Sequence, residues 1–230
     1  NNYKAIYVPN DSDIEGEANF EIQFSDLAGN EGTPITASTN NTKVIFDKTP
    51  PADFTVGLLT PTGGNQVDGM WNLTNTGMDI IIPVANDTTL KNGTVQLYGK
   101  VGSNSFEVLG SISTILSNEI NANKIISVSS TLIEGLTGFS EGQRIYVKAV
   151  MSDRPGNITE GSQSIIEILI DETPASITPI SILSSNNNTA LAKVGDTVSV
   201  SFTTSENLID TTAIISGQNA IITSLGGNQF

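Results

Sequence analysis

Apolar and polar residues alternate along short stretches of this chain, as they do in strands that are buried on one face only. Residues 3–8 (Tyr-Lys-Ala-Ile-Tyr-Val) show the pattern first. Residues 20–24 repeat it and place Phe20, Ile22 and Phe24 on one side. Because successive side chains of a strand point to opposite faces, we expect these three to face inward.

A turn and a returning strand follow. Asp-Leu-Ala-Gly-Asn at 26–30 predicts the turn, because Asp hydrogen-bonds to nearby backbone and Gly accepts positive φ. The returning strand is expected within residues 33–46. Asp-Lys-Thr-Pro-Pro at 47–51 ends it, since proline cannot donate to a sheet ladder.

The same alternation recurs between residues 52 and 171 in about seven short segments. The predicted strands are 54–59, 78–84, 94–100, 106–111, 125–130, 144–151 and 165–170. Seven short strands in about 120 residues are typical of a Greek-key sandwich of immunoglobulin type, without the Cys–Trp–Cys pattern of antibody domains. Residues 113–121 are the single weak helix candidate. Beyond them, residues 198–202, 213–216 and 220–223 are strand-like.

Two sequence signals occur twice, in the same order. Val-Ile-Phe-Asp-Lys-Thr-Pro-Pro at 44–51 matches Ile-Leu-Ile-Asp-Glu-Thr-Pro-Ala at 168–175, 124 residues later. Phe-Ser-Asp-Leu-Ala-Gly-Asn at 24–30 matches Met-Ser-Asp-Arg-Pro-Gly-Asn at 151–157, 127 residues later. Recurrence at nearly one interval indicates a repeated structural unit.

The repeat divides the chain into three segments. We predict that residues 49–172 form a complete domain, that 1–48 are the C-terminal half of another, and that 173–230 are the N-terminal half of a third. The two halves together number 106 residues, about one domain. Neither half can close a core alone. The predicted fold is therefore all-β, with tandem immunoglobulin-like Greek-key β-sandwiches in an extended array, each half completed by an adjacent repeat, covalently or by strand complementation.

The composition argues against several classes of function. The net charge of −14 argues against nucleic acid or an anionic membrane surface as partner. Cysteine and histidine are absent, which excludes thiolate and imidazole catalysis and the usual zinc sites. No stretch approaches the ~18 apolar residues of a membrane span. The carboxylates that could support glycoside hydrolysis lie in loops, with few aromatic residues to line a sugar cleft. We therefore expect that the chain is not an enzyme. Trp71 is interpreted as a core or edge residue in preference to a sugar-stacking platform.

The order strand, Asp-Leu-Ala-Gly-Asn, strand, Asp-Lys-Thr-Pro-Pro resembles the bacterial Ig-like repeats of large surface proteins and adhesins. Residues 194–206 (Val-Gly-Asp-Thr-Val-Ser-Val-Ser-Phe-Thr-Thr-Ser-Glu) share the resemblance. Gly-Leu-Thr at 135–137 with Ile-Tyr-Val-Lys-Ala at 145–149 is also similar to a fibronectin type III turn and strand. The resemblance implies an extracellular stalk or filament on a bacterial cell surface, often stiffened by Ca²⁺ between domains. Host or surface glycans and proteins would then be bound through other domains.

Acidic and amide side chains gather in loops that sandwich topology places at the domain junctions. Ca²⁺ takes six to eight oxygen ligands, and such groups supply them. The candidate metal ligands at the first junction are Asp11, Asp13, Glu15, Asp47, Asn86, Asp87, Asp153 and Asn157. Those at the second junction are Asp171 and Glu206, beside Glu141 and Glu172. Asp-x-x-Gly-Asn is equally a good hairpin turn without a metal, and acidic loops are usually just solvated.

The pattern as a whole predicts a non-catalytic structural segment, the stalk or shaft of a surface adhesin or extracellular fibre. Two alternatives stay open. One is an Ig-like module that binds a glycan or protein through its end loops, and the other is an accessory domain of a secreted polysaccharide-degrading enzyme.

Overall fold

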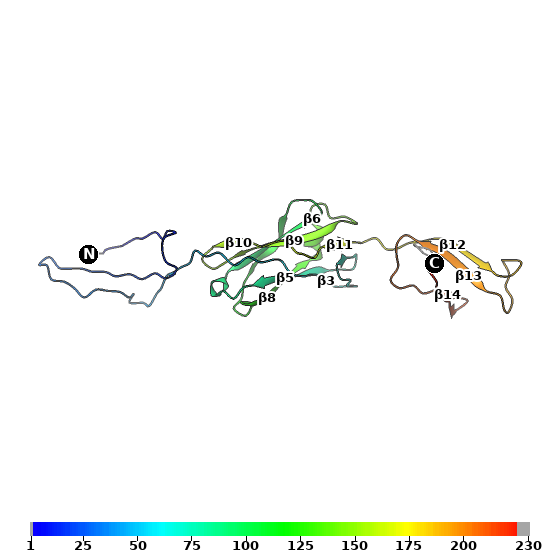
Figure 1. Cartoon of the computed structure of the whole chain (residues 1–230), viewed down its shortest axis with the longest axis horizontal. Coiled ribbons are helices and arrows are strands. Elements are labelled where there is room, and N and C mark those ends of the chain that lie inside the picture. Colours follow the sequence, from blue (N-terminus) through cyan, green and yellow to red (C-terminus); the bar gives the residue numbers. More distant parts are fainter. Residues whose placement is uncertain (1, 225–230) are drawn as a thin grey trace. The chain divides into compact units, whose positions relative to one another are not determined.

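The computed structural model describes residues 2–224; residues 1 and 225–230, at the outer ends of the two predicted half-domains, lie outside it (Figure 1). Strands hold 37% of the residues and helices 4%, which confirms the predicted all-β class. The chain forms two compact units, Asn1–Asp171 and Glu172–Phe230.

The first unit contains most of the regular structure. Its elements are β1 (Gly16–Glu17), β2 (Ile45–Phe46), β3 (Leu59–Thr62), β4 (Met70–Trp71), β5 (Gly77–Val84), η1 (Thr88–Leu90), β6 (Thr94–Val101), β7 (Glu107–Thr114), β8 (Ala122–Ser129), α1 (Ser130–Glu134), β9 (Arg144–Ser152), β10 (Ile158–Glu160) and β11 (Ile168–Ile170). The second unit contains β12 (Ile177–Ser184), β13 (Val198–Thr204), β14 (Ile214–Ile215) and β15 (Gln218–Asn219).

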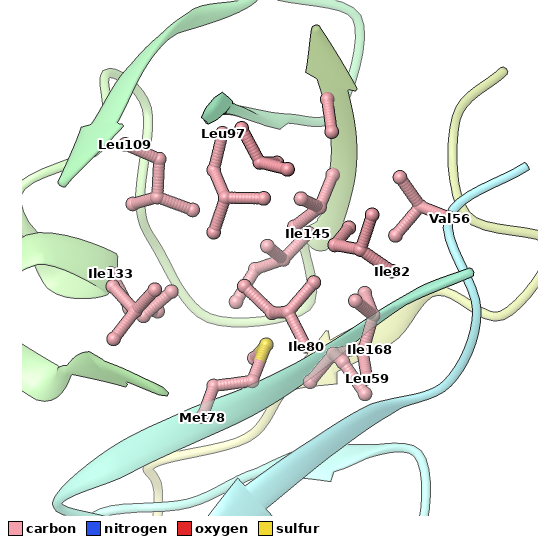
Figure 2. Packing of buried hydrophobic residues seen from close by; sticks show 14 of the residues in the cluster. Val56, Leu59, Met78, Ile80, Ile82, Leu97, Leu109, Ile133, Ile145 and Ile168 are labelled. Atoms are coloured by element: carbon pink, nitrogen blue, oxygen red, sulfur yellow. The ribbon is translucent and has the colours of Figure 1, made fainter. Parts of the chain in front are cut away.

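Two sheets of the first unit enclose the main core, and we call this part (residues 49–171) the central sandwich. One sheet has the order β3-β5-β8, and the other has the order β4-β11-β9-β6-β7 with β10 on β9. Met78, Ile80 and Ile82 alternate along β5 and are fully buried, as is Ile145 on β9. Figure 2 shows these side chains pointing into the space between the sheets, together with Leu97 of β6. The alternation read from the sequence therefore selects the core face correctly.

The first predicted strand of this domain is displaced. Residues 54–59 do not form one strand: β3 begins at Leu59, and Thr55 makes only an isolated parallel bridge to Ser162. The cause is that the chain crosses between sheets here. The N–H of Val56 donates to Ser162 O at 3.1 Å, while the N–H of Gly57 donates to Ile81 O at 2.8 Å.

The weak helix candidate at 113–121 is wrong. β7 continues to Thr114, and turns follow up to β8. The α-helix in the described residues is instead α1, which has five residues, buries Ile133 and is capped by Gly135. A single turn of helix is too short to show a 3.6-residue hydrophobic period, so the pattern gave no sign of it.

Predicted strands in the N-terminal segment (residues 1–48) are mostly absent as regular strands. Residues 3–8 belong to no strand, and Tyr3, Ile6 and Val8 are each more than two-thirds exposed. Residues 20–24 make only the isolated bridge Ile22–Ile35. The return within 33–46 is regular only at β2. A strand needs a hydrogen-bonded neighbour, and local alternation does not guarantee one within the same chain.

The N-terminal segment nevertheless pairs in the same register as the second half of the central sandwich. Glu17 pairs with Ile45 and Gly16 with Phe46. Shifted by 127 residues on the first strand and 124 on the second, these are Arg144 with Leu169 and Gln143 with Ile170. Leu169 does pair with Arg144, and the N–H of Ile170 donates to Gln143 O at 2.8 Å. The repeat seen in the sequence is thus also a repeat of backbone pairing.

The second unit is an antiparallel pair with a short hairpin. Ile180 lies opposite Phe202 and Ile182 opposite Val200 in β12–β13. The predicted strand 198–202 coincides with β13, but 220–223 is not a strand. Instead β14 turns directly into β15, because Ser216 and Gly217 both have positive φ (50° and 78°), as tight hairpin turns require.

Candidate functional site at the domain junction

Two turns with the same sequence signal also have the same hydrogen bonds. Asp26 Oδ1 accepts the N–H of Asn30 at 2.8 Å, and Asn30 Nδ2 donates to Asp26 Oδ2 at 2.7 Å. Asp153 Oδ1 accepts the N–H of Asn157 at 2.7 Å, and Asn157 Nδ2 donates to Asp153 Oδ2 at 2.9 Å. In both turns the Asp N–H donates to the Asn carbonyl. The carboxylate closes the turn, as the Asp-x-x-Gly-Asn pattern predicted.

The second of these turns contacts the exit of the N-terminal segment. Asp153 is only 4% exposed, and Asn157 Nδ2 also donates to Asp47 O at 3.2 Å. Thr159 Oγ1 donates to Pro51 O nearby. The structure therefore brings together three of the predicted ligands, Asp47, Asp153 and Asn157. Both carboxylate oxygens of Asp153 already accept protein donors.

Asp47 has one side-chain oxygen that is buried without a hydrogen-bond partner in the described residues. Its Oδ1 accepts the N–H of Thr49 at 3.0 Å. Its Oδ2 is buried and has no hydrogen-bond partner within residues 2–224. A buried carboxylate oxygen without a donor is costly, so this atom suits a cation or a further donor.

The acidic loop at 10–15 surrounds a lysine. Lys48 Nζ donates to the carbonyl oxygens of Asp11 and Asp13 at 2.6 and 3.0 Å. Asp13 accepts Tyr7 OH at 2.6 Å, and that bond is the main cause that holds the pKa of Asp13 below its usual value. Glu15 Oε1 accepts Thr49 Oγ1 at 2.6 Å, which likewise lowers the pKa of Glu15. The ammonium group already supplies a cation here, so this donor set does not fit Ca²⁺ as it is arranged.

The remaining predicted ligands have local roles. Asp87 Oδ1 accepts the N–H and Oγ1 of Thr89 at 2.8 and 2.7 Å and so caps η1. Thr89 O in turn accepts the N–H of Arg154 at 3.0 Å, which places this cap beside the Asp153 turn. Asn86, next to Asp87, is exposed.

At the second predicted junction the candidates belong to separate units. Asp171 ends the first unit, and its N–H donates to Trp71 O at 2.8 Å. Glu206 lies in the second unit, where its carbonyl accepts Thr204 Oγ1 at 2.6 Å. Across the described part of the chain, no three Asp, Glu, His or Cys side chains are grouped as a metal site. Calcium at either junction stays a prediction.

Sequence reasoning missed a set of side chains on the outer face of β6 and β9, which we call the aromatic–lysine face. Lys100 Nζ lies 4.8 Å from the ring centre of Phe106 and 5.1 Å from that of Tyr146. Lys148 Nζ lies 4.8 Å from Phe106 and 5.8 Å from Tyr98. Alternation already places these residues outward, but their grouping depends on cross-strand register, which one sequence does not reveal.

Two further observations bear on function. Trp71 is fully buried, as expected for a core residue, and is not accessible to a sugar ring. Within residues 2–224, no helix is long and apolar enough to cross a membrane.

No protein-family model matches the chain, and no curated protein or solved structure is significantly similar to it. The case for a function therefore depends on the chain's own repeat and on the geometry described above.

Proposed function

We propose that this chain is a non-catalytic structural segment, part of the stalk or shaft of an extracellular bacterial surface protein built from tandem Ig-like sandwiches. The observation that carries the proposal is the repeated pairing register of the N-terminal segment and of β9–β11. A unit repeated with its hydrogen bonds unchanged is what a tandem array contains.

The strand order supports the Ig-like part of the proposal. In constant-type immunoglobulin sandwiches the first, second, fourth and fifth strands share one sheet and the third, sixth and seventh share the other, while variable-type sandwiches add strands that follow the third to this second sheet. Here β3, β5 and β8 share one sheet, while β6, β9 and β11 share the other, with β7 at its edge. β4 follows β3 in the chain but pairs in parallel with β11 in the other sheet, as the later part of a first strand does when that strand changes sheets.

The hydrogen bonds near the two ends of the central sandwich suit a load-bearing role. The N–H of Ser162 donates to Phe54 O at 2.8 Å, and the N–H of Val56 donates to Ser162 O at 3.1 Å, in a parallel bridge. β4 and β11 are also parallel. A pull on residues 49 and 171 acts along these parallel segments in opposite directions. It loads their hydrogen bonds in shear, so that several must break together.

Single-molecule pulling of the full chain by its two ends tests this role. We expect one resisted unfolding event that lengthens the chain by roughly 40 nm, because about 120 residues extend by about 3.5 Å each. Ser162→Pro removes one sheared donor and should lower the unfolding force, whereas Ser162→Ala keeps the N–H and should not. Unfolding without measurable resistance would contradict a load-bearing shaft.

The aromatic–lysine face favours a second candidate, a binding module. Aromatic and cationic side chains together suit acidic or sugar ligands. Binding of the chain to a glycan array, lost in Tyr98→Ala and retained in a variant of an exposed serine such as Ser103→Ala, would favour this candidate. Absence of binding would leave the shaft as the better explanation.

A further inference from the structure

The N-terminal segment carries an apolar face that its own part of the chain does not cover. Phe20, Ile22 and Phe24 are 44%, 52% and 54% exposed, and Val44, next to β2, is 69% exposed. A shallow groove of about 390 Å³ runs beside this face. We call these four residues the N-terminal face.

The central sandwich reveals what belongs over such a face. The residues at the corresponding positions, 127 or 124 residues later, are Val147, Ala149, Met151 and Ile168. They are at most 1% exposed. They are covered by the opposite sheet, whose strands β3 and β5 contribute Leu59, Ile80 and Ile82 to the same core. The missing cover of the N-terminal face is therefore a sheet of the β3–β5 kind.

The second unit contains such a sheet, and its apolar side is partly exposed. β12 and β13 pair antiparallel, as β3 and β5 do. Ile180 and Ile182 are 67% and 62% exposed, and they stand opposite Phe202 and Val200. An open groove of about 470 Å³ is lined by Val198, Val200 and Phe202 on one side and by residues of the 213–223 hairpin on the other. We call Ile180, Ile182, Val200 and Phe202 the C-terminal face.

We propose that the C-terminal face of one copy of this chain binds the N-terminal face of a second copy, and that the two together complete a sandwich at each joint. Burial of these side chains would remove several hundred Å² of apolar surface on each partner, toward the lower end of specific interfaces. The interface is heterologous, because different faces meet, so that association continues head to tail and does not stop at a dimer. This inference deepens the proposed shaft by naming the interaction that joins its copies.

Electrostatics gives the proposal a distinctive salt dependence. Residues 1–48 contain eight acidic and three basic residues, and residues 172–230 contain four acidic residues and one lysine. The two segments that carry these faces therefore have net charges of the same sign. Salt screens that repulsion while it leaves apolar burial in place, so association should strengthen as salt is raised.

Sedimentation and light scattering of the full chain, from about 1 µM to about 1 mM, test the proposal. We expect the average mass to rise with concentration and to exceed that of a dimer. Ile22→Asp should abolish association through one face and Ile182→Asp through the other, so that each variant alone is monomeric. An equimolar mixture of the two should form dimers only, because one intact face of each kind remains.

Matched controls add the same charge at the neighbouring positions, where extended backbone points the side chain the other way. Gln23→Asp and Leu183→Asp should associate like the unaltered chain, and the fluorescence of Trp71 should report an intact central sandwich in every variant. A chain that stays monomeric throughout, variants that still associate alone, or controls that are equally impaired would each overturn the proposal. Such an outcome would leave the pulling experiment unaffected, since that experiment probes only the central sandwich.

Discussion

At the residue scale, one buried ion pair dominates the polar part of the central sandwich. Lys124 is 5% exposed, and its Nζ lies 3.0 Å from both carboxylate oxygens of Glu119 and 2.9 Å from Thr114 O. Removal of one partner leaves the other charge buried without compensation, and such changes cost about 3–5 kcal/mol. Replacement of both partners together by apolar side chains of similar size is often nearly neutral.

We therefore expect Glu119→Ala to lower the free energy of unfolding by about 3–5 kcal/mol, and the double variant Glu119→Leu with Lys124→Met to lower it far less. Urea unfolding followed by the fluorescence of Trp71 measures both, because that single tryptophan is buried in the same core. Equal losses in the two variants would mean that the cost does not come from leaving the lysine charge buried and unpaired.

At the element scale, the Asp26–Asn30 turn should depend on pH. Its hydrogen bonds, above all the one from the Asn30 side chain, hold the pKa of Asp26 below its ordinary value of 3.8. A carboxyl group whose folded pKa is lowered contributes stability that is complete above its unfolded pKa and is lost as pH falls through the folded pKa.

NMR from about pH 6 down to about pH 2 should therefore show the Asn30 amide losing its hydrogen-bonded shift only below about pH 4. Asp26→Asn has no charge to lose, so its turn should show no such transition. A transition that persists in this variant would assign the effect to another group.

The elements also show which features could be predicted from the sequence alone. Alternation located β5 and β9 because each has a paired neighbour within the central sandwich. It failed at residues 3–8, where the same pattern has no ladder to join. The Asp-x-x-Gly-Asn motif predicted its turn correctly because the bonds are local. Whether residues 11–15 could bind a metal depends on which group their loop surrounds. That group is Lys48, which lies 33 residues beyond Glu15, so the local sequence pattern does not reveal it.

At the scale of the whole molecule, calcium is the remaining question raised by the net charge of −14. Any divalent cation screens the repulsion between the acidic side chains of such a chain. The effect of specific binding must therefore be distinguished from general screening. The one carboxylate oxygen at the first junction that is buried without a partner in residues 2–224 is Asp47 Oδ2, and the main-chain carbonyl of the same residue accepts the Asn157 amide. A calcium ion bound there would have to use this atom.

The expected result for such a site is a rise in melting temperature when calcium replaces a chelator. At a free concentration of about 100 times Kd, binding to the folded state adds about 2.7 kcal/mol, which amounts to several degrees. Magnesium at equal ionic strength serves as the control, because it demands a tighter octahedral shell and should give a smaller shift. Asp47→Asn should abolish the difference between the two ions. Equal melting temperatures with calcium, magnesium and chelator would instead mean that the junction is held by its own turns and by Lys48.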